Sequence, residues 1–145
     1  MSEITNKPKA LFWIISTIAL LWNLMGVGAF FFEMTSEPQA LIEAYGQAEA
    51  DMVFARPGWA TGVFAVAVFG GAIGCLLLLL RKKIAIWPLL ISLIAVLLQQ
   101  GYIWGMTDAA KLMSGADYIM PIMIPVIAIF LVWFARKKTA KGWLV

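Results

Sequence analysis

Histidine is absent from this chain of 145 residues, and Cys75 is its only cysteine. An intrachain disulfide is therefore impossible, and the commonest general base and metal ligand is missing. The sequence also lacks a nucleophile–base pair, a glycine-rich phosphate loop and a cluster of metal-ligating residues. We therefore expect that the chain is not an enzyme and that it holds no metal and no cofactor.

Charge is scarce as well, because only 13% of the residues are charged while 63% are hydrophobic. A soluble domain has about 25% charged residues. Four apolar runs, 10–32, 59–80, 84–106 and 119–134, contain no Asp, Glu, Lys, Arg or His. A bilayer core about 30 Å thick needs about 20 apolar residues per helical crossing, so three runs are long enough and the fourth approaches that length. These runs predict an all-α, polytopic membrane protein, an antiparallel four-transmembrane-helix bundle that forms a single domain over residues 1–145.

The N-terminus allows one alternative to a first transmembrane helix. Lys7 and Lys9 precede the first apolar run as in a signal peptide, and 27–29 would serve as a cleavage site. The run continues to Phe32, however, which is longer than the roughly 7–15 residues of a signal core. We therefore favour a retained first helix.

Basic residues gather on one side of the predicted spans. Nine of the eleven bases fall on that side and two on the other. Positive charge in short loops marks the cytoplasmic face. Both termini are therefore predicted to be cytoplasmic, and since the bases sit at span ends we expect no nucleic-acid partner. The base-rich side carries Lys7, Lys9, Arg81, Lys82, Lys83, Arg136, Lys137, Lys138 and Lys141, with the acid Glu3. The other side carries Glu33, Glu37, Glu43, Glu49, Asp51, Asp108 and Asp117, with the bases Arg56 and Lys111.

The first outer loop has the pattern of a surface helix. Ser36 and Gln39 have the spacing of a capping box, and Pro38 suits the first turn. Apolar residues then recur with helical period, which predicts an amphipathic helix over about 37–54 on the outer surface. The alternative is a solvated loop, and the outer acids are interpreted as a solvated face.

The two halves of the chain resemble each other. Residues 16–23 and 92–99 both have the pattern Ser-x-Ile-Ala-x-Leu-x-(Asn or Gln). The second and fourth runs are both followed by the triplet Arg-Lys-Lys. This predicts two similar hairpins related by an axis along the membrane normal. Coincidence between apolar helices is the alternative.

The matched amides Asn23 and Gln99 are the main candidates for a site. Both lie beyond the midpoints of their helices toward the outer face, where lipid offers no hydrogen-bond partner. One interpretation is an outward-open pocket in which the two amides face each other and bind a neutral polar solute. The other is ordinary hydrogen bonding between helices. Further polar or aromatic candidates for this pocket are Ser16 and Ser92, each seven residues before its amide, and Trp22, Gln100 and Tyr102.

A Gly-x-x-x-Gly motif at Gly70 and Gly74 lies in the second run. Such a motif lets another helix approach closely. We expect this contact to form inside the monomer rather than between copies.

Residues 11–16, running into 21–26, resemble the first helix of small, functionally uncharacterised bacterial inner-membrane proteins, some of which are labelled sugar-transporter-like. The size and the four spans also resemble the DoxX-like group. The first resemblance implies solute transport, and the second implies a redox-associated role.

These patterns lead to a ranked set of functions for a multi-pass protein of the bacterial inner membrane. First comes a transporter or permease for a small neutral, sugar-like solute. A non-catalytic accessory or scaffold protein of the membrane and a DoxX-like redox-associated protein are the alternatives. The expected partners are the lipid bilayer, a small polar solute, and either further copies of the chain or another membrane protein.

The charge distribution generates a topology prediction. Reporter fusions after Val145 and at Gln47 should report opposite sides of the membrane, with Val145 cytoplasmic, because bases flank only one side of the predicted spans. Phosphatase and fluorescent-protein fusions in the same host measure this directly. An external Val145 would contradict the predicted topology.

Overall fold

Four long helices dominate the computed structural model, which describes residues 7–107, 111 and 115–145. They are α1 (Ala10–Thr35), α4 (Gly58–Leu79), α5 (Ile86–Met106) and α7 (Ile119–Ala140). Each is long and apolar enough to cross a membrane, and all regular elements in the described ranges are helical. Glu3 and Asp108, whose sides were predicted above, lie outside the described residues, as does the side chain of Asp117.

The helix boundaries follow the apolar runs closely, except in α7. The fourth run was expected to end near residue 134, but α7 continues through Arg136 and Lys137 to Ala140. Cations in the last turn are favourable because they lie near the negative end of the helix dipole. A short 3-10 helix, η1 (Lys83–Ala85), leads from the α4–α5 turn into α5, and a second, η2 (Gly115–Tyr118), leads into α7.

The outer segment differs from its prediction, because it forms two helices instead of one. These are α2 (Pro38–Tyr45) and α3 (Gln47–Phe54), and Gly46 separates them with a φ of 90°, a conformation that favours glycine. The predicted capping box is wrong. Glu37 is the N-cap of α2, no side chain caps the helix, and Gln39 donates a hydrogen bond to Glu43 instead.

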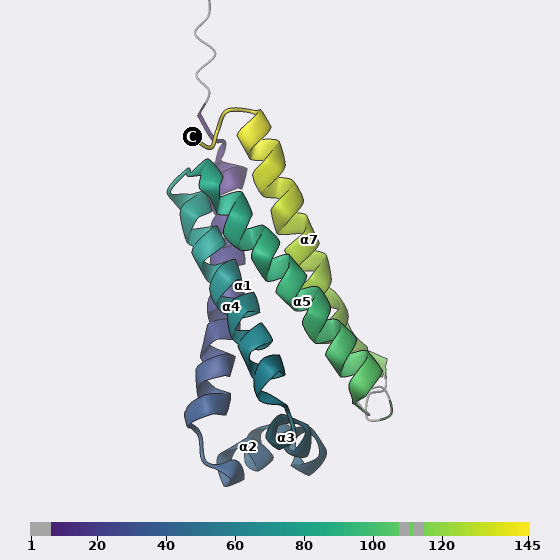
Figure 1. Ribbon diagram of the computed structural model, residues 1–145. Coiled ribbons are helices and arrows are strands. Elements are labelled where there is room, and N and C mark those ends of the chain that lie inside the picture. Colours follow the sequence, from purple (N-terminus) through teal and green to yellow (C-terminus); the bar gives the residue numbers. More distant parts are fainter. Residues whose placement is uncertain (1–6, 108–110, 112–114) are drawn as a thin grey trace, which may run out of the picture.

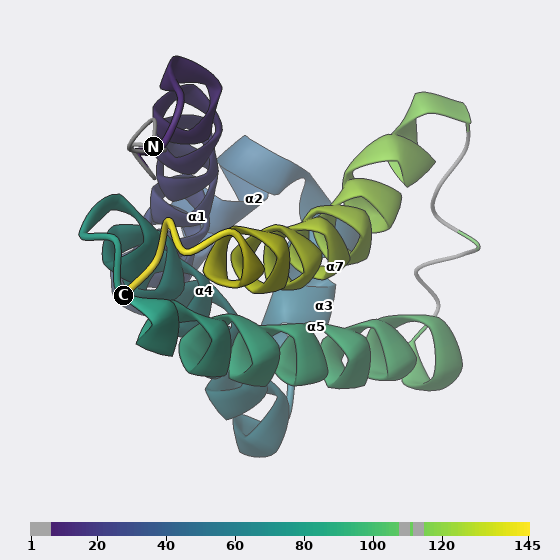
Figure 2. The same ribbon diagram turned by 90° about the horizontal axis from the view of Figure 1, so that it is seen from above.

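Consecutive long helices lie side by side, so that α1 packs on α4, α4 on α5, and α5 on α7 (Figure 1). We call the end with the α4–α5 turn and the last turn of α7 the basic end, and the end with α2 and α3 the acidic end. The pair α5 and α7 diverges from the pair α1 and α4 toward the acidic end, as both views show (Figures 1 and 2). The bundle is therefore a wedge that narrows toward its basic end.

Glycines bring α4 close to α5. A Cβ built on Gly70 would lie 3.1 Å from the carbonyl oxygen of Pro88, and one on Gly74 would lie 2.5 Å from Cγ of Leu89. The Gly-x-x-x-Gly motif thus lies against a neighbouring helix of the same chain. Small residues at such positions let the helix backbones approach closely, which increases dispersion contacts.

Aromatic residues close the basic end. Phe12 of α1 stacks on Phe134 of α7 with 5.7 Å between ring centroids, and Trp143 meets Phe12 edge-on at 6.0 Å. The ammonium of Lys138 lies 4.5 Å from the centroid of the Trp143 ring, a favourable cation–π geometry. Residues 143–145 are held against the α4–α5 turn, because Arg81 Nε donates to the carbonyl of Trp143 and the Val145 amide donates to the carbonyl of Arg81, both at 2.9 Å.

The glycine contact generates a stability prediction. Gly74→Leu should destabilise the fold by about 1–3 kcal/mol, because the new side chain overlaps the position of Leu89. Thermal unfolding in detergent measures the effect. Gly62→Leu is the matched control on the same helix, since a Cβ at Gly62 meets nothing within 4 Å. Equal melting of the two variants would contradict the close packing of α4 on α5.

Candidate functional site

A cavity of about 620 Å³ lies within the wedge. All four long helices contribute to its wall, and Tyr45, Met52 and Arg56 line it from the segment that joins α1 to α4. Ligand pockets in proteins have volumes of about 300–1,000 Å³ and mostly apolar walls with a few polar groups. This cavity has that size and that kind of wall.

Five of the seven predicted pocket residues line this one cavity. The two others lie elsewhere: Ser16 is fully buried outside the cavity, and its Oγ has no hydrogen-bond partner among the described residues. Gln100 accepts a hydrogen bond from Trp104 Nε1 at 2.7 Å on the exposed face of α5. The cavity-lining members of the predicted set are Trp22, Asn23, Ser92, Gln99 and Tyr102.

Asn23 belongs to a polar layer that joins three helices. Its Nδ2 donates to the Ala19 carbonyl at 2.8 Å and to Cys75 Sγ at 3.4 Å. The amide packs directly on Gly71, where a Cβ would lie only 1.9 Å from Oδ1 of Asn23 and 3.3 Å from Oγ of Ser92. Ser92 in turn donates to the carbonyl of Ala67 on α4. Hydrogen bonds between and within the helices therefore account for much of this layer, as the second interpretation of the sequence expected.

Gln99 and Tyr102 differ from that layer. They are three residues apart on α5, so they lie on the same face of the helix. In the described part of the chain neither side chain has a hydrogen-bond partner, although the Tyr102 ring meets Trp59 edge-on at 5.3 Å. Asn23 and Gln99 share the cavity wall without bonding each other. The amide of Gln99 and the hydroxyl of Tyr102 are thus wall groups that remain open to a ligand.

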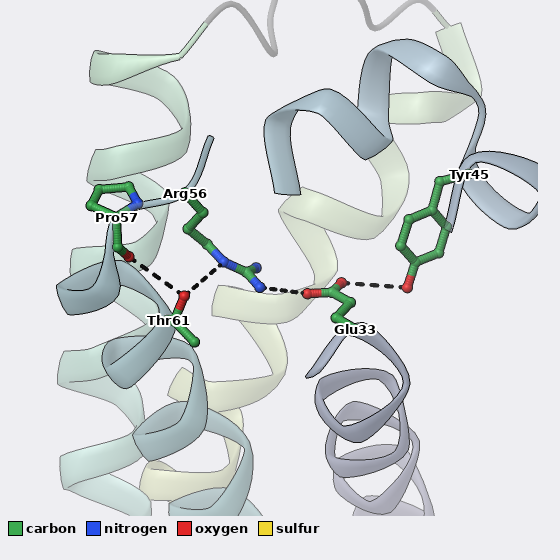
Figure 3. A network of polar contacts seen from close by, with 5 residues as sticks. All are labelled: Glu33, Tyr45, Arg56, Pro57 and Thr61. Atoms are coloured by element: carbon green, nitrogen blue, oxygen red, sulfur yellow. Dashed lines mark hydrogen bonds and ion pairs between the residues drawn. The ribbon is translucent and has the colours of Figure 1, made fainter. Parts of the chain in front are cut away.

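An ion pair that the sequence analysis missed lies at the acidic end of the cavity (Figure 3). Arg56 Nη2 lies 2.7 Å from Glu33 Oε2, and the two side chains are only 12% and 11% exposed. Arg56 Nε also donates to Thr61 Oγ1 at 3.3 Å, and Tyr45 donates its hydroxyl to Glu33 Oε1 at 3.3 Å. The guanidinium lies over the ring of Phe64, 5.2 Å from its centroid.

The interpretation of all the outer acids as a solvated face is therefore wrong for Glu33. The one available signal was that Arg56 is an isolated base on a side rich in acids. Burial, followed by the nearby charge of Glu33, raises the pKa of Tyr45, so the phenol remains a hydrogen-bond donor near neutral pH. Glu33, Tyr45 and Arg56 all line the cavity, so this network ties α1, α2 and the start of α4 together at the acidic end of the cavity.

The wall offers hydrogen-bonding groups and apolar surface to a ligand. Among the described residues, no group of three or more His, Cys, Asp or Glu side chains is placed to hold a metal ion. Cys75 is buried and accepts the hydrogen bond from Asn23. The wall presents amides, hydroxyls and aromatic rings to a ligand, with the charged groups Glu33, Glu49 and Arg56 at its acidic end.

Comparison of the chain with protein-family models, with curated proteins and with solved structures finds no match. The function proposed below therefore depends on the sequence and on the geometry of the cavity.

The Glu33–Arg56 pair generates a stability prediction. Arg56→Gln should destabilise the fold by about 1–3 kcal/mol, because it leaves a largely buried carboxylate without its counter-ion. The double variant Glu33→Gln/Arg56→Gln should recover part of this loss. Thermal unfolding in detergent, arranged as a double-mutant cycle, measures the coupling.

Glu43→Gln is the control for this cycle, because Glu43 is exposed and its removal should change stability by less than about 0.5 kcal/mol. Strictly additive effects of Glu33→Gln and Arg56→Gln would contradict the importance of the pair.

Proposed function

We propose that this chain is an integral membrane protein that binds a small uncharged solute in the cavity between its four spans, in the manner of a permease. The length and composition of α1, α4, α5 and α7 support membrane insertion. The cavity supports solute binding, because its volume of about 620 Å³ and its mixed wall match those of small-molecule sites.

The observation that carries this proposal is the asymmetry of the cavity. At the basic end the stacked rings of Phe12 and Phe134 and the side chain of Trp143 close the bundle. Toward the acidic end the helices diverge, and the cavity lies in the space between them (Figure 1). Transporters alternate between states closed on one side and open on the other. A wedge closed at one end has the shape expected of one such state.

An uncharged solute fits the distribution of charge. The cavity wall within the four apolar runs carries amides and hydroxyls but no Asp, Glu, Lys, Arg or His. The charged lining residues, Glu33, Glu49 and Arg56, all lie at the acidic end, where Glu33 and Arg56 neutralise each other. Proton-coupled transporters generally place an ionisable relay within their spans. We therefore favour facilitated passage or binding over proton-coupled transport.

Orientation follows from the charge distribution in the sequence. With the bases of 81–83 and 136–138 at the cytoplasmic face, the narrow, closed end of the bundle is cytoplasmic and its wide end lies toward the outer face. We place the protein in a bacterial inner membrane, with both termini in the cytoplasm and no catalytic activity.

A second candidate function is a non-catalytic accessory protein that packs against another membrane protein. The bonding of Asn23 and Ser92 within the bundle favours it, because these polar groups then serve the fold alone. Solute binding separates the two candidates, since a pure scaffold gains no stability from any solute, whereas a ligand that binds the native state raises its stability by mass action.

The proposal generates a binding prediction. Across a panel of uncharged solutes, at least one should raise the melting temperature of the purified protein in detergent, and Ala128→Trp should abolish that shift by filling the cavity. Ile129→Trp is the matched control, because Ile129 is the next residue of α7 but is 53% exposed and lies outside the cavity wall. Absence of any solute-dependent shift in the wild type, or an equal shift in the two variants, would contradict a solute site here.

A further inference from the structure

We infer that the solute is an uncharged amphiphile of the lipid phase, and that it reaches the cavity sideways, through an opening between α1 and α7, to bond with Gln99 and Tyr102. This inference rests on the proposed function and adds to it the chemical class of the solute and its route.

The packing of the helices leaves one side of the cavity without continuous cover. Contacts along α1–α4, α4–α5 and α5–α7 cover three sides. Over the described residues, α1 and α7 are not packed together in this way, and their aromatic contact is that of Phe12 with Phe134 at the basic end. Figure 2, viewed from above, shows that α7 lies near α1 at its C-terminal end and runs away from it toward its N-terminal end. The side between α1 and α7 is therefore where the cavity is least enclosed.

Two methionines mark the rim of this opening. Met25 of α1 is 66% exposed and Met120 of α7 is 51% exposed, yet both also line the cavity. A residue that is on the outer surface and in the cavity wall at once lies where the two surfaces join. Both belong to helices apolar enough to span a membrane, so the opening faces lipid in the proposed orientation. Methionine suits such a rim because its flexible side chain adapts to varied apolar surfaces.

The acidic end is the less open route. Helices α2 and α3 lie across this end beside α1 and α4, and Tyr45, Met52 and Val53 of these helices line the cavity there (Figure 1). The bond between Tyr45 and Glu33, and the ion pair between Glu33 and Arg56, hold this cover to the ends of α1 and α4. A solute from the aqueous side would have to displace this cover, whereas a solute in the lipid would not.

The side chains that line the cavity indicate which kind of solute it binds. From the polar layer at Asn23 toward the acidic end, most of the wall is apolar, and the Gln99 amide and the Tyr102 hydroxyl have no hydrogen-bond partner in the described part of the chain. A sugar would leave most of its hydroxyls without hydrogen bonds against such a wall, which is costly. An apolar body with one or two hydroxyl, carbonyl or amide groups satisfies both parts of the wall. A long-chain alcohol is a simple member of this class.

A photolabelling experiment tests the inference. The full chain in nanodiscs is incubated with a long-chain alcohol that carries a diazirine in its alkyl chain, illuminated, digested and mapped by mass spectrometry. We expect saturable labelling of cavity-lining residues of α1, α5 and α7, competed by the unmodified alcohol. Gln99→Leu and Tyr102→Phe should each weaken apparent binding about 5- to 10-fold, the factor that corresponds to one lost hydrogen bond.

Gln100→Leu is the matched control, because Gln100 is adjacent to Gln99 but bonds to Trp104 outside the cavity, so it should label like the wild type. Melting curves check that each variant is folded. Tyr102→Phe retains the ring that contacts Trp59, so it carries the test if Gln99→Leu does not fold.

The other outcomes separate this inference from the proposed function. Labelling that is unsaturable and equal on exposed residues such as Leu98 and Ile129 would overturn the inference. If a sugar raises the melting temperature and alcohols neither bind nor compete, the proposed function stands and the inference fails. Saturable binding of only a cationic or only an anionic amphiphile would also overturn it. If no solute and no amphiphile binds, both fail.

Discussion

The close approach of α4 to its two neighbours is the contact on which the rest of the structure depends. Gly70 and Gly74 bring α4 against α5, while Gly71 accepts the amide of Asn23 from α1. Small residues on two faces of one helix therefore draw three helices together. The fourth, α7, packs on α5 alone along most of its length and meets α1 through Phe134. The cavity is a consequence of this arrangement, because α1 and α5 are drawn close to α4 and α7 is not.

The two ends of the wedge are stabilised by different forces. At the basic end, ring stacking and cation–π contacts gather Phe12, Phe134 and Trp143 under Lys138. At the acidic end, one largely buried ion pair, Glu33 with Arg56, holds the segment between α1 and α4. The first contact is mainly dispersive and tolerates small displacements, whereas the second is directional, because it consists of the hydrogen bonds that join Glu33 to Arg56 and to Tyr45. In the proposed transporter, the two ends would therefore respond differently to the same movement of α7.

The sequence was sufficient for the helices and for part of the site, and the reasons are physical. Span length and helical period depend on local composition, so the four long helices could be predicted. Reasoning from helix faces grouped Asn23 with Gln99, and both line the cavity. It could not tell how far the cavity extends along the bundle. Ser16 shares a face with Asn23 but lies nearer the basic end, outside the cavity wall. Gln100 is turned about 100° from Gln99 and points outward. The Glu33–Arg56 pair joins residues 23 positions apart, and only the tertiary fold brings them together.

The attachment of residues 143–145 to the α4–α5 turn has a consequence for biosynthesis. The Val145 amide bonds to the carbonyl of Arg81, and the Lys83 amide bonds to the carbonyl of Val145. These bonds cannot form until the ribosome has completed the chain as far as Val145. Helices α1, α4 and α5 are therefore all synthesised before the segment that seals the basic end becomes available.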